Sequence, residues 1–281
     1  MTGDRFLAAS TITFRREPLD VAVARARDGG YDAIDLGLIR EFCPHWDPVE
    51  TTERLTAQFV EEMRGGGTPI RVVTAAPPFE FAPVAQGKIA IQYAEESVKL
   101  AGKLGARVVV FTAFDAPEAG ESADAKRARI GAALKRLAAT GAAVGVTVAI
   151  EAPAPNSLCP DAAATEKLLA AAGAGDALRV AFDSAHAGAG GADPAAAFAA
   201  LARRIAHVQL RDIARDGGGS APPGEGTIDF DALFAAIGAA GYAGGFSVEL
   251  LSDALDLDVR AKESARARAF VAPRLAAAGL L

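Results

Sequence analysis

The segment TVAIE at residues 147–151 is a short apolar, β-branched run that ends on a carboxylate, and this pattern decides the fold. Three later segments are similar and carry an oxygen-bearing side chain at or next to their last residue, namely RVAFD at 179–183, AHVQL at 206–210 and FSVEL at 246–250. Longer stretches rich in Ala, Leu, Arg and Glu lie between such runs, with apolar residues at helical spacing. Strands of a parallel sheet are apolar in this way because helices cover both faces. The pattern therefore predicts a chain of strand–helix units.

Four more runs of this kind in the first half of the chain bring the units to eight, each of roughly 30 residues. They are FLAAST at 6–11, AIDLG at 33–37, IRVVTA at 70–75 and RVVVFTA at 107–113. Glycines end several helical stretches just before a strand, namely Gly30, Gly105, Gly145 and Gly241. Eight units favour a closed barrel, and no G-x-G-x-x-G motif follows the first strand. We expect an α/β fold, a (β/α)8 TIM barrel, with residues 1–281 forming a single domain.

The stretch GGGSAPPGEG at 217–226 is rich in glycine and proline but does not separate two apolar cores. It follows a predicted strand, so we expect a long loop at the barrel mouth and not a domain boundary. Arg215, just before this stretch, is expected to be a surface charge.

Composition and charge exclude several classes of protein. Apolar residues make up 51% of the chain and charged residues 23%, which is typical of a protein with a large core. The net charge of −6 argues against a nucleic-acid partner, which needs a basic face. Cys43 and Cys159 are too far apart for a disulfide framework or a cysteine zinc site. We find no signal-peptide pattern and no apolar run of about 20 residues, so we expect no membrane partner and a cytoplasmic location.

Oxygen-bearing side chains end the last four predicted strands: Glu151, Asp183, Gln209 and Glu249. Closing the barrel brings these ends to one mouth, where barrel active sites are built. Three carboxylates and an amide oxygen suit Mg²⁺ or Mn²⁺ better than Zn²⁺, which more often recruits imidazole or thiolate. For any single residue, a solvated strand end or a helix N-cap is the alternative. Four consecutive strands that end in this way favour a divalent-metal site.

Two side chains near these strand ends are candidates for substrate binding. His186 lies three residues beyond Asp183 and is expected just above the metal, with capping or packing as the alternative. Arg211 shares the facing of Gln209 and extends past it, so it is a candidate to bind a carboxylate or phosphate bidentately, with a surface charge as the alternative. His207 faces the same way one layer deeper, where a hydrogen-bonded core histidine is expected.

Aromatic residues after the second and third predicted strands are candidate pocket walls. REFCPHWDP at 40–48 presents His45 beside Trp46, and PPFEF at 77–81 offers Phe79. An apolar sugar face or a ring would pack against such a surface. Local packing within the loops is the alternative for all three residues.

Taken together, these segments resemble the xylose isomerase-like TIM barrels, often called the sugar phosphate isomerase/epimerase family. The motifs that carry the resemblance are AIEAP at 149–153, FDSAH at 182–186, AHVQLRD at 206–212, PPGEGTIDF at 222–230 and FSVEL at 246–250. GYDAIDLG at 30–37 and KLAGKLGARVVV at 99–110 also fit. The resemblance thus spans essentially the whole chain.

The resemblance implies a barrel with one divalent metal ion, Mn²⁺ or Mg²⁺, held by Glu151, Asp183, Gln209 and Glu249. His186 matches a family histidine that contacts substrate. The implied activity is isomerisation or epimerisation of a sugar or keto-polyol, with proton abstraction next to a carbonyl and a metal-stabilised enediolate. Glu151 and Glu249 are then the expected bases, one on each face of the substrate. Family members often form dimers or tetramers, so a homo-oligomer is a further expectation.

Gln209 departs from the best-known members of this family. Ketose 3-epimerases such as D-tagatose 3-epimerase have a histidine ligand at this position, whereas glutamine resembles the 3-dehydroshikimate dehydratase branch. A lyase of that type is the alternative activity, because protonation of a departing hydroxyl would turn the same machinery into a dehydratase. A barrel that binds a ligand without catalysis is the alternative from another class. The AP-endonuclease branch of the family uses many histidines to bind several zinc ions. This chain has only three histidines, so it does not resemble that branch.

Overall fold

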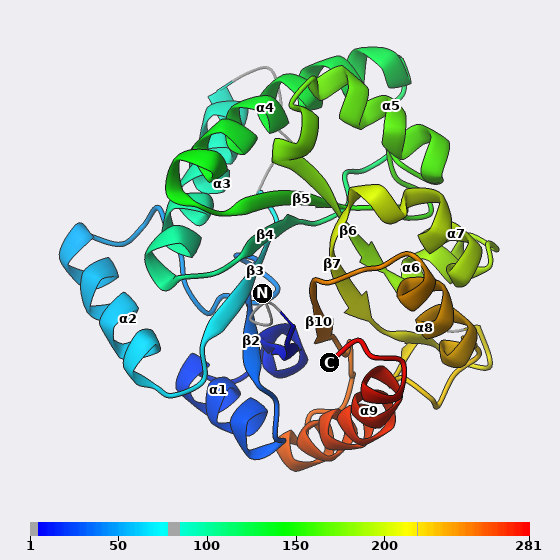
Figure 1. The fold of residues 1–281 in the computed structure, drawn as a ribbon. Coiled ribbons are helices and arrows are strands. Elements are labelled where there is room, and N and C mark those ends of the chain that lie inside the picture. Colours follow the sequence, from blue (N-terminus) through cyan, green and yellow to red (C-terminus); the bar gives the residue numbers. More distant parts are fainter. Residues whose placement is uncertain (1–4, 78–84, 218) are drawn as a thin grey trace.

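The computed structural model describes residues 5–77, 85–217 and 219–281 of the protein. In this part of the chain, eight parallel strands close into a barrel in the order β1-β2-β3-β4-β5-β6-β7-β10, and β10 pairs with β1. Figure 1 shows the helices on the outside of these strands. This arrangement confirms the predicted α/β fold, a (β/α)8 TIM barrel. The barrel strands are β1 (Leu7–Ser10), β2 (Ala33–Leu38), β3 (Ile70–Ala75), β4 (Val108–Phe111), β5 (Thr147–Glu151), β6 (Leu178–Asp183), β7 (Ile205–Leu210) and β10 (Gly245–Val248).

Helices alternate with the barrel strands, and the predicted glycine stops are confirmed. Gly30, Gly105, Gly145 and Gly241 all have positive φ, between 69° and 81°, a conformation that glycine adopts without strain. None of the helices in the described ranges is both long and apolar enough to cross a membrane. The α-helices are α1 (Leu19–Asp28), α2 (Glu53–Gly65), α3 (Ala85–Leu104), α4 (Ala123–Val144), α5 (Ala162–Ala172), α6 (Ser184–Ala189), α7 (Pro194–Leu201), α8 (Phe230–Ala239) and α9 (Leu257–Ala277). The shorter elements are the 3₁₀ turns η1 (Thr11–Phe14), η2 (Gly175–Ala177) and η3 (Ala202–Arg204) and the strands β8 (Asp212–Ile213) and β9 (Ser220–Ala221).

Small side chains and one aromatic ring fill the inside of the barrel at its amino-terminal end. Ala8, Ala149 and Ala181 belong to a buried cluster that also contains Phe6. A Cβ atom on Gly245, the first residue of β10, would lie 2.2 Å from Cζ of Phe6, so the Phe6 ring occupies the space that a larger residue would need. This packing closes one end of the barrel and leaves the carboxyl ends of the strands for a functional site.

The loop after β7 is built around the buried carboxylate of Asp212. This carboxylate accepts hydrogen bonds from the backbone N–H groups of Gly224 at 3.0 Å, Gly226 at 2.9 Å and Ile228 at 2.9 Å. The strands β8 and β9 also pair here in antiparallel fashion. The stretch 217–226, which we expected to be a plain loop, therefore contributes one strand of a short hairpin. The loop is therefore stabilised by charge-assisted hydrogen bonds to one carboxylate and not by an apolar core of its own.

Candidate metal and active site

The four predicted metal ligands lie at the carboxyl ends of adjacent strands. Glu151 and Asp183 are the last residues of β5 and β6, Gln209 is the next to last of β7, and Glu249 directly follows β10. In the register of the barrel, Asp183 lies opposite Gln209, and Gln209 lies opposite Ser247, two residues before Glu249. All four side chains are buried. The fold therefore places all four at one mouth of the barrel. Among the described residues, Glu151 and Asp183 belong to a compact group of possible metal donors, and Glu249 lies outside that group.

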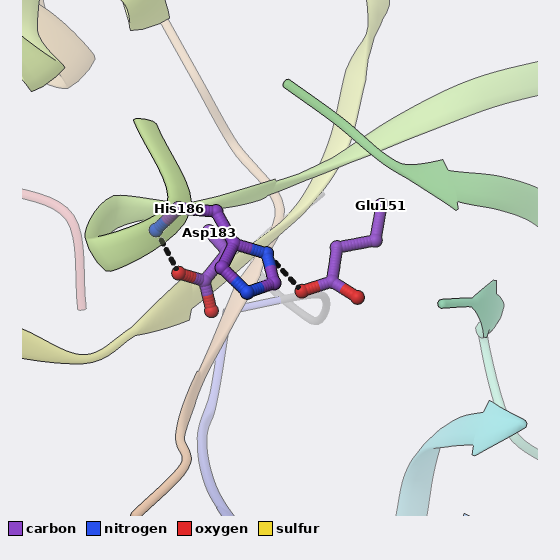
Figure 2. Close-up of side chains that lie close together, drawn as sticks. All are labelled: Glu151, Asp183 and His186. Carbon is purple, nitrogen blue, oxygen red and sulfur yellow. Dashed lines mark hydrogen bonds and ion pairs between the residues drawn. The ribbon is translucent and has the colours of Figure 1, made fainter. Parts of the chain in front are cut away.

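Both oxygens of the Asp183 carboxylate are engaged. Oδ1 accepts a 2.8 Å hydrogen bond from the backbone N–H of His186 and caps the start of α6 (Figure 2). Oδ2 accepts a 2.7 Å hydrogen bond from Nε of Arg211. Burial by itself would raise the pKa of Asp183, but the positive charges of Arg211 and His186 outweigh burial and lower it. Asp183 is thus held as an ionised carboxylate.

His186 and Glu151 are in contact across two strand–helix units. Figure 2 shows the imidazole pointing toward the carboxylate, with 2.8 Å between Nδ1 of His186 and Oε1 of Glu151. Burial alone would lower the pKa of His186, but the charge of Asp183 and the contact with Glu151 raise it to about 9. The His186 side chain is 32% exposed, whereas Glu151 is buried. His186 is therefore the member of this cluster that meets solvent.

The guanidinium of Arg211 lies among three carboxylates. In addition to its bond with Asp183, Nη1 lies 3.4 Å from Oε1 of Glu249 and Nη2 lies 4.0 Å from Oε1 of Glu151. The side chain is only 4% exposed. Burial opposes the positive charge, but the three carboxylates outweigh burial and raise the pKa of Arg211. Arg211 has the facing that the sequence predicted, and its contacts add a resident cation to the ligand set.

Glu249 and Gln209 are the least satisfied members of the site. Burial raises the pKa of Glu249 to about 8, and the nearby charge of Arg211 offsets only part of this shift. Nε2 of Gln209 donates a 3.3 Å hydrogen bond to Oε2 of Glu249. Oε1 of Gln209 is buried and has no hydrogen-bond partner among the described residues. A cation or a ligand donor would satisfy this oxygen, which is otherwise costly to bury.

These donors fit a divalent metal ion. One ligand atom from each of Glu151, Asp183 and His186 lies within 4.8 Å of the other two in the described part of the chain. Gln209, opposite Asp183 in the register, adds the amide oxygen that lacks a partner. Carboxylate and amide oxygens suit Mg²⁺ and Mn²⁺, and the imidazole makes the set compatible with Zn²⁺ as well. His186, assigned to substrate from the sequence, is thus also a candidate ligand.

Two of the loop residues predicted as pocket walls contact neighbouring elements of the fold, η1 and α2. Nδ1 of His45 lies 3.0 Å from Oγ1 of Thr11. Trp46 stacks on Phe59 of α2, with the ring centroids 4.0 Å apart. Phe79 lies outside the described residues. Substrate roles for His45, Trp46 and Phe79 therefore stay predictions, and the contacts of the first two are those that loop packing requires.

A buried polar group that the sequence analysis missed lies inside the barrel. Asp35 of β2 accepts a 2.7 Å hydrogen bond from Oγ1 of Thr74, and burial raises the pKa of Asp35 to about 6. Its signal in the sequence is a carboxylate within the apolar strand AIDLG. His207 is a buried core histidine, as predicted, with Nε2 lying 2.8 Å from Oγ of Ser247. Arg215 is exposed, also as predicted.

Solved structures of several enzymes share this fold. A structure of L-ribulose 3-epimerase is 22% identical and aligns with a TM-score of 0.78, covering 98% of this chain and 95% of that one. The probable 3-DHS dehydratase of petrobactin synthesis from Bacillus anthracis is 17% identical, with a TM-score of 0.74 and coverage of 95% and 98%. The IOLI protein with a bound zinc atom is 17% identical, with a TM-score of 0.76 and coverage of 95% and 97%. At these identities the likeness demonstrates the fold.

The family follows from a match in the sequence itself. A family model described as xylose isomerase-like TIM barrel matches residues 23–271, which is most of the chain. None of the curated proteins that were compared matches it. The closed barrel of the structure agrees with the fold that this description names. The chain therefore belongs to the xylose isomerase-like TIM barrel family.

Proposed function

We propose that this protein is a divalent-metal-dependent isomerase or epimerase that acts on a sugar or keto-polyol by moving a proton next to a carbonyl. The observation that carries the proposal is the cluster of Glu151, Asp183 and His186 at the strand ends of a barrel of this family. Solved structures with the same fold include a sugar 3-epimerase and a zinc-bound protein, which supports a small sugar as substrate and a metal in the site.

The metal would be held by Glu151, Asp183, Gln209 and Glu249, with His186 as a further candidate. When bound, the metal supplies a Lewis acid that polarises a substrate carbonyl and acidifies the neighbouring C–H bond. Capping of α6 engages one oxygen of Asp183 and so fixes the orientation of its carboxylate in advance. The unpartnered oxygen of Gln209 is likewise available without breaking an existing hydrogen bond.

Glu151 and Glu249 are the proposed bases. They come from β5 and β10, which are separated in the barrel by β6 and β7, so they reach a substrate above the strand ends from different sides. Two bases on opposite faces permit removal of a proton from one face and its return to the other. The contact between His186 and Glu151 orients that carboxylate, and the partly exposed imidazole would contact a substrate hydroxyl.

The proposal is tested first by metal content and then by isotope exchange. The purified protein is expected to hold one Mn²⁺, Mg²⁺ or Zn²⁺ per chain and to introduce solvent deuterium into at least one member of a keto-sugar panel in D₂O. Glu151→Gln and Glu249→Gln are each expected to slow this exchange by a factor on the order of 10² or more. Glu61→Gln, on the exposed surface of α2, is the matched control. Absence of a bound divalent ion, or exchange that persists in both variants, would reject the proposal.

A 3-dehydroshikimate dehydratase is the second candidate activity. It is favoured by glutamine at position 209 and by the shared fold with a probable 3-DHS dehydratase. In this reaction one carboxyl group would remove the proton and the other would protonate the departing hydroxyl. Incubation with 3-dehydroshikimate distinguishes the two activities, because dehydration gives an aromatic product that absorbs in the ultraviolet. A barrel that binds sugars but catalyses neither reaction would be the non-catalytic alternative.

A further inference from the structure

Arg211 is a cation inside the proposed metal-ligand set. Its guanidinium contacts Asp183 at 2.7 Å and Glu249 at 3.4 Å, and it approaches Glu151 to 4.0 Å. Burial of a guanidinium is costly unless carboxylates or other acceptors surround it. The same oxygens that would bind a divalent ion therefore already compensate a positive charge.

A divalent ion and Arg211 compete for these oxygens. Oδ1 of Asp183 is taken by the backbone N–H of His186, so Oδ2, which Arg211 contacts, is the freer of the two for a metal. A divalent ion at that oxygen repels the guanidinium and weakens its hold on the carboxylates. The long side chain of arginine then re-orients within the site, where its five N–H donors need new acceptors.

The charges of the site indicate which kind of substrate group would accept hydrogen bonds from the displaced guanidinium of Arg211. When ionised, Glu151, Asp183 and Glu249 carry three negative charges. One divalent ion, the guanidinium of Arg211 and the imidazolium of His186 together match or exceed this charge. A substrate with a single negative charge then meets a site without net repulsion and finds an unsatisfied guanidinium. A neutral substrate offers only hydroxyl and carbonyl oxygens, which compensate a buried cation less well than a carboxylate does. A carboxylate also matches the planar, two-pronged edge of the guanidinium.

We propose, on the basis of the metal-dependent function above, that Arg211 selects substrates that carry a carboxylate next to the reacting hydroxy-ketone group. Metal binding releases the guanidinium from Asp183 and Glu249, and the substrate carboxylate takes their place. Arg211 is thus the specificity-determining residue of the site, and the preferred substrates are keto acids of the sugar type instead of neutral ketoses.

Two achiral probes separate the carboxylate from all other features of a substrate. Hydroxypyruvate and dihydroxyacetone share the hydroxy-ketone group. On the other side of the carbonyl, hydroxypyruvate carries a carboxylate and dihydroxyacetone carries a hydroxymethyl group. Their affinities for the Mn²⁺-loaded protein are measured by calorimetry. In the unaltered protein the acid is expected to bind at least about tenfold more tightly, as a charge-assisted pair requires. Arg211→Gln is expected to abolish the preference, and Arg211→Lys to keep part of it because the charge remains.

The Mn²⁺ affinity of each variant is measured independently, from the free-ion signal in electron paramagnetic resonance. Arg211→Gln is expected to bind Mn²⁺ more tightly than the unaltered protein, because a competing cation is gone. Arg266→Gln, which removes an exposed arginine paired with Glu225, is the control and should change neither measurement. Circular dichroism verifies that Arg211→Gln is folded, and Arg211→Lys supplies the comparison if it is not.

The outcomes distinguish this inference from the function on which it rests. If neither the unaltered protein nor Arg211→Gln binds Mn²⁺, the metal-dependent function is wrong and the inference falls with it. If Mn²⁺ binds but the acid is not preferred, only the substrate class is wrong. A preference for the acid that persists in Arg211→Gln comes from the metal alone and overturns the role of Arg211. Tighter Mn²⁺ binding together with a lost preference supports the inference.

Discussion

The imidazole of His186 lies 2.8 Å from the carboxylate of Glu151, although the two residues belong to different strand–helix units. His186 reaches this position because Asp183 caps the helix on which it lies. The contact links a residue with access to solvent to a buried carboxylate at the centre of the site. It also makes the protonation of His186 a direct report on Glu151.

The first prediction is a pKa change at His186 in the metal-free protein. Burial alone would lower this pKa, but the charge of Asp183 and the contact with Glu151 raise it to about 9, above the ordinary 6.5. Glu151→Gln removes one of the two favourable contributions, so the pKa of His186 should fall. Nuclear magnetic resonance titration of the imidazole measures it. Glu249→Gln is the matched control, and an equal fall in both variants would contradict the pairing with Glu151.

The second prediction concerns metal removal. Mn²⁺ that binds the folded protein alone should stabilise it by about 2.7 kcal/mol when its concentration is 100 times the dissociation constant. This stabilisation should raise the melting temperature, and removal of Mn²⁺ by a chelator should lower the melting temperature again. Asp183→Asn should weaken Mn²⁺ binding at least about tenfold, because the ionised ligand is lost. Asp176→Asn, at an exposed aspartate, is the control. A melting temperature that does not respond to Mn²⁺ would count against the site.

The third prediction is a pH dependence of stability that depends on Asp35. Burial raises the pKa of Asp35 from 3.8 to about 6 in the folded protein, and the hydrogen bond from Thr74 offsets only part of this rise. Between these pH values the folded chain keeps a proton that the unfolded chain has lost. The free energy of unfolding therefore decreases as pH rises through this window, by about 3 kcal/mol in total as an order of magnitude.

Asp35→Asn keeps an acceptor for Thr74 and cannot ionise. Relative to the unaltered protein, this variant should gain stability as the pH rises from 4 to 7 and should show no relative gain below about pH 4. Urea unfolding at several pH values measures the difference. A difference that stays constant across this range would show that Asp35 does not titrate inside the barrel.

The fourth prediction concerns the loop after β7. Asp212→Ala removes a carboxylate that accepts from the backbone N–H groups of Gly224, Gly226 and Ile228, so all three lose this partner, and the donor of Gly226 is buried. The expected loss of stability is on the order of 3 kcal/mol. Asp28→Ala, at an exposed helix end, should change stability by less than about 0.5 kcal/mol. If Asp212→Ala also lowered the free energy of unfolding by less than about 0.5 kcal/mol, other contacts would have to hold the loop.

Much of the fold and the facing of the ligands followed from local patterns in the sequence. Strand residues two apart share a face, so His207, Gln209 and Arg211 were expected to point inward together, and they do. The strand ends carried the ligand positions because all strands of a parallel barrel end at one mouth. These inferences need only the spacing within one segment and the closure of the barrel.

The contacts between side chains within the site could not be predicted from local sequence patterns. The approach of Arg211 to Glu151 and Glu249 depends on the relative register of strands that lie far apart in the sequence. Asp35 was missed because its partner Thr74 lies on another strand. The stacking of Trp46 on Phe59 was not foreseen either, because a loop sequence does not reveal which residue of the next helix meets its ring.

The two roles of Asp183 have a consequence for how this protein can evolve. Because the same carboxylate starts a helix and faces the proposed metal position, a replacement at residue 183 must satisfy folding before its chemistry is ever selected. Gln209 has no such second role, since its amide oxygen has no hydrogen-bond partner among the described residues. Residue 209 can therefore be replaced by another type of ligand without loss of the fold. Among proteins that share this barrel, we expect changes of reaction to arise first through substitutions at this position.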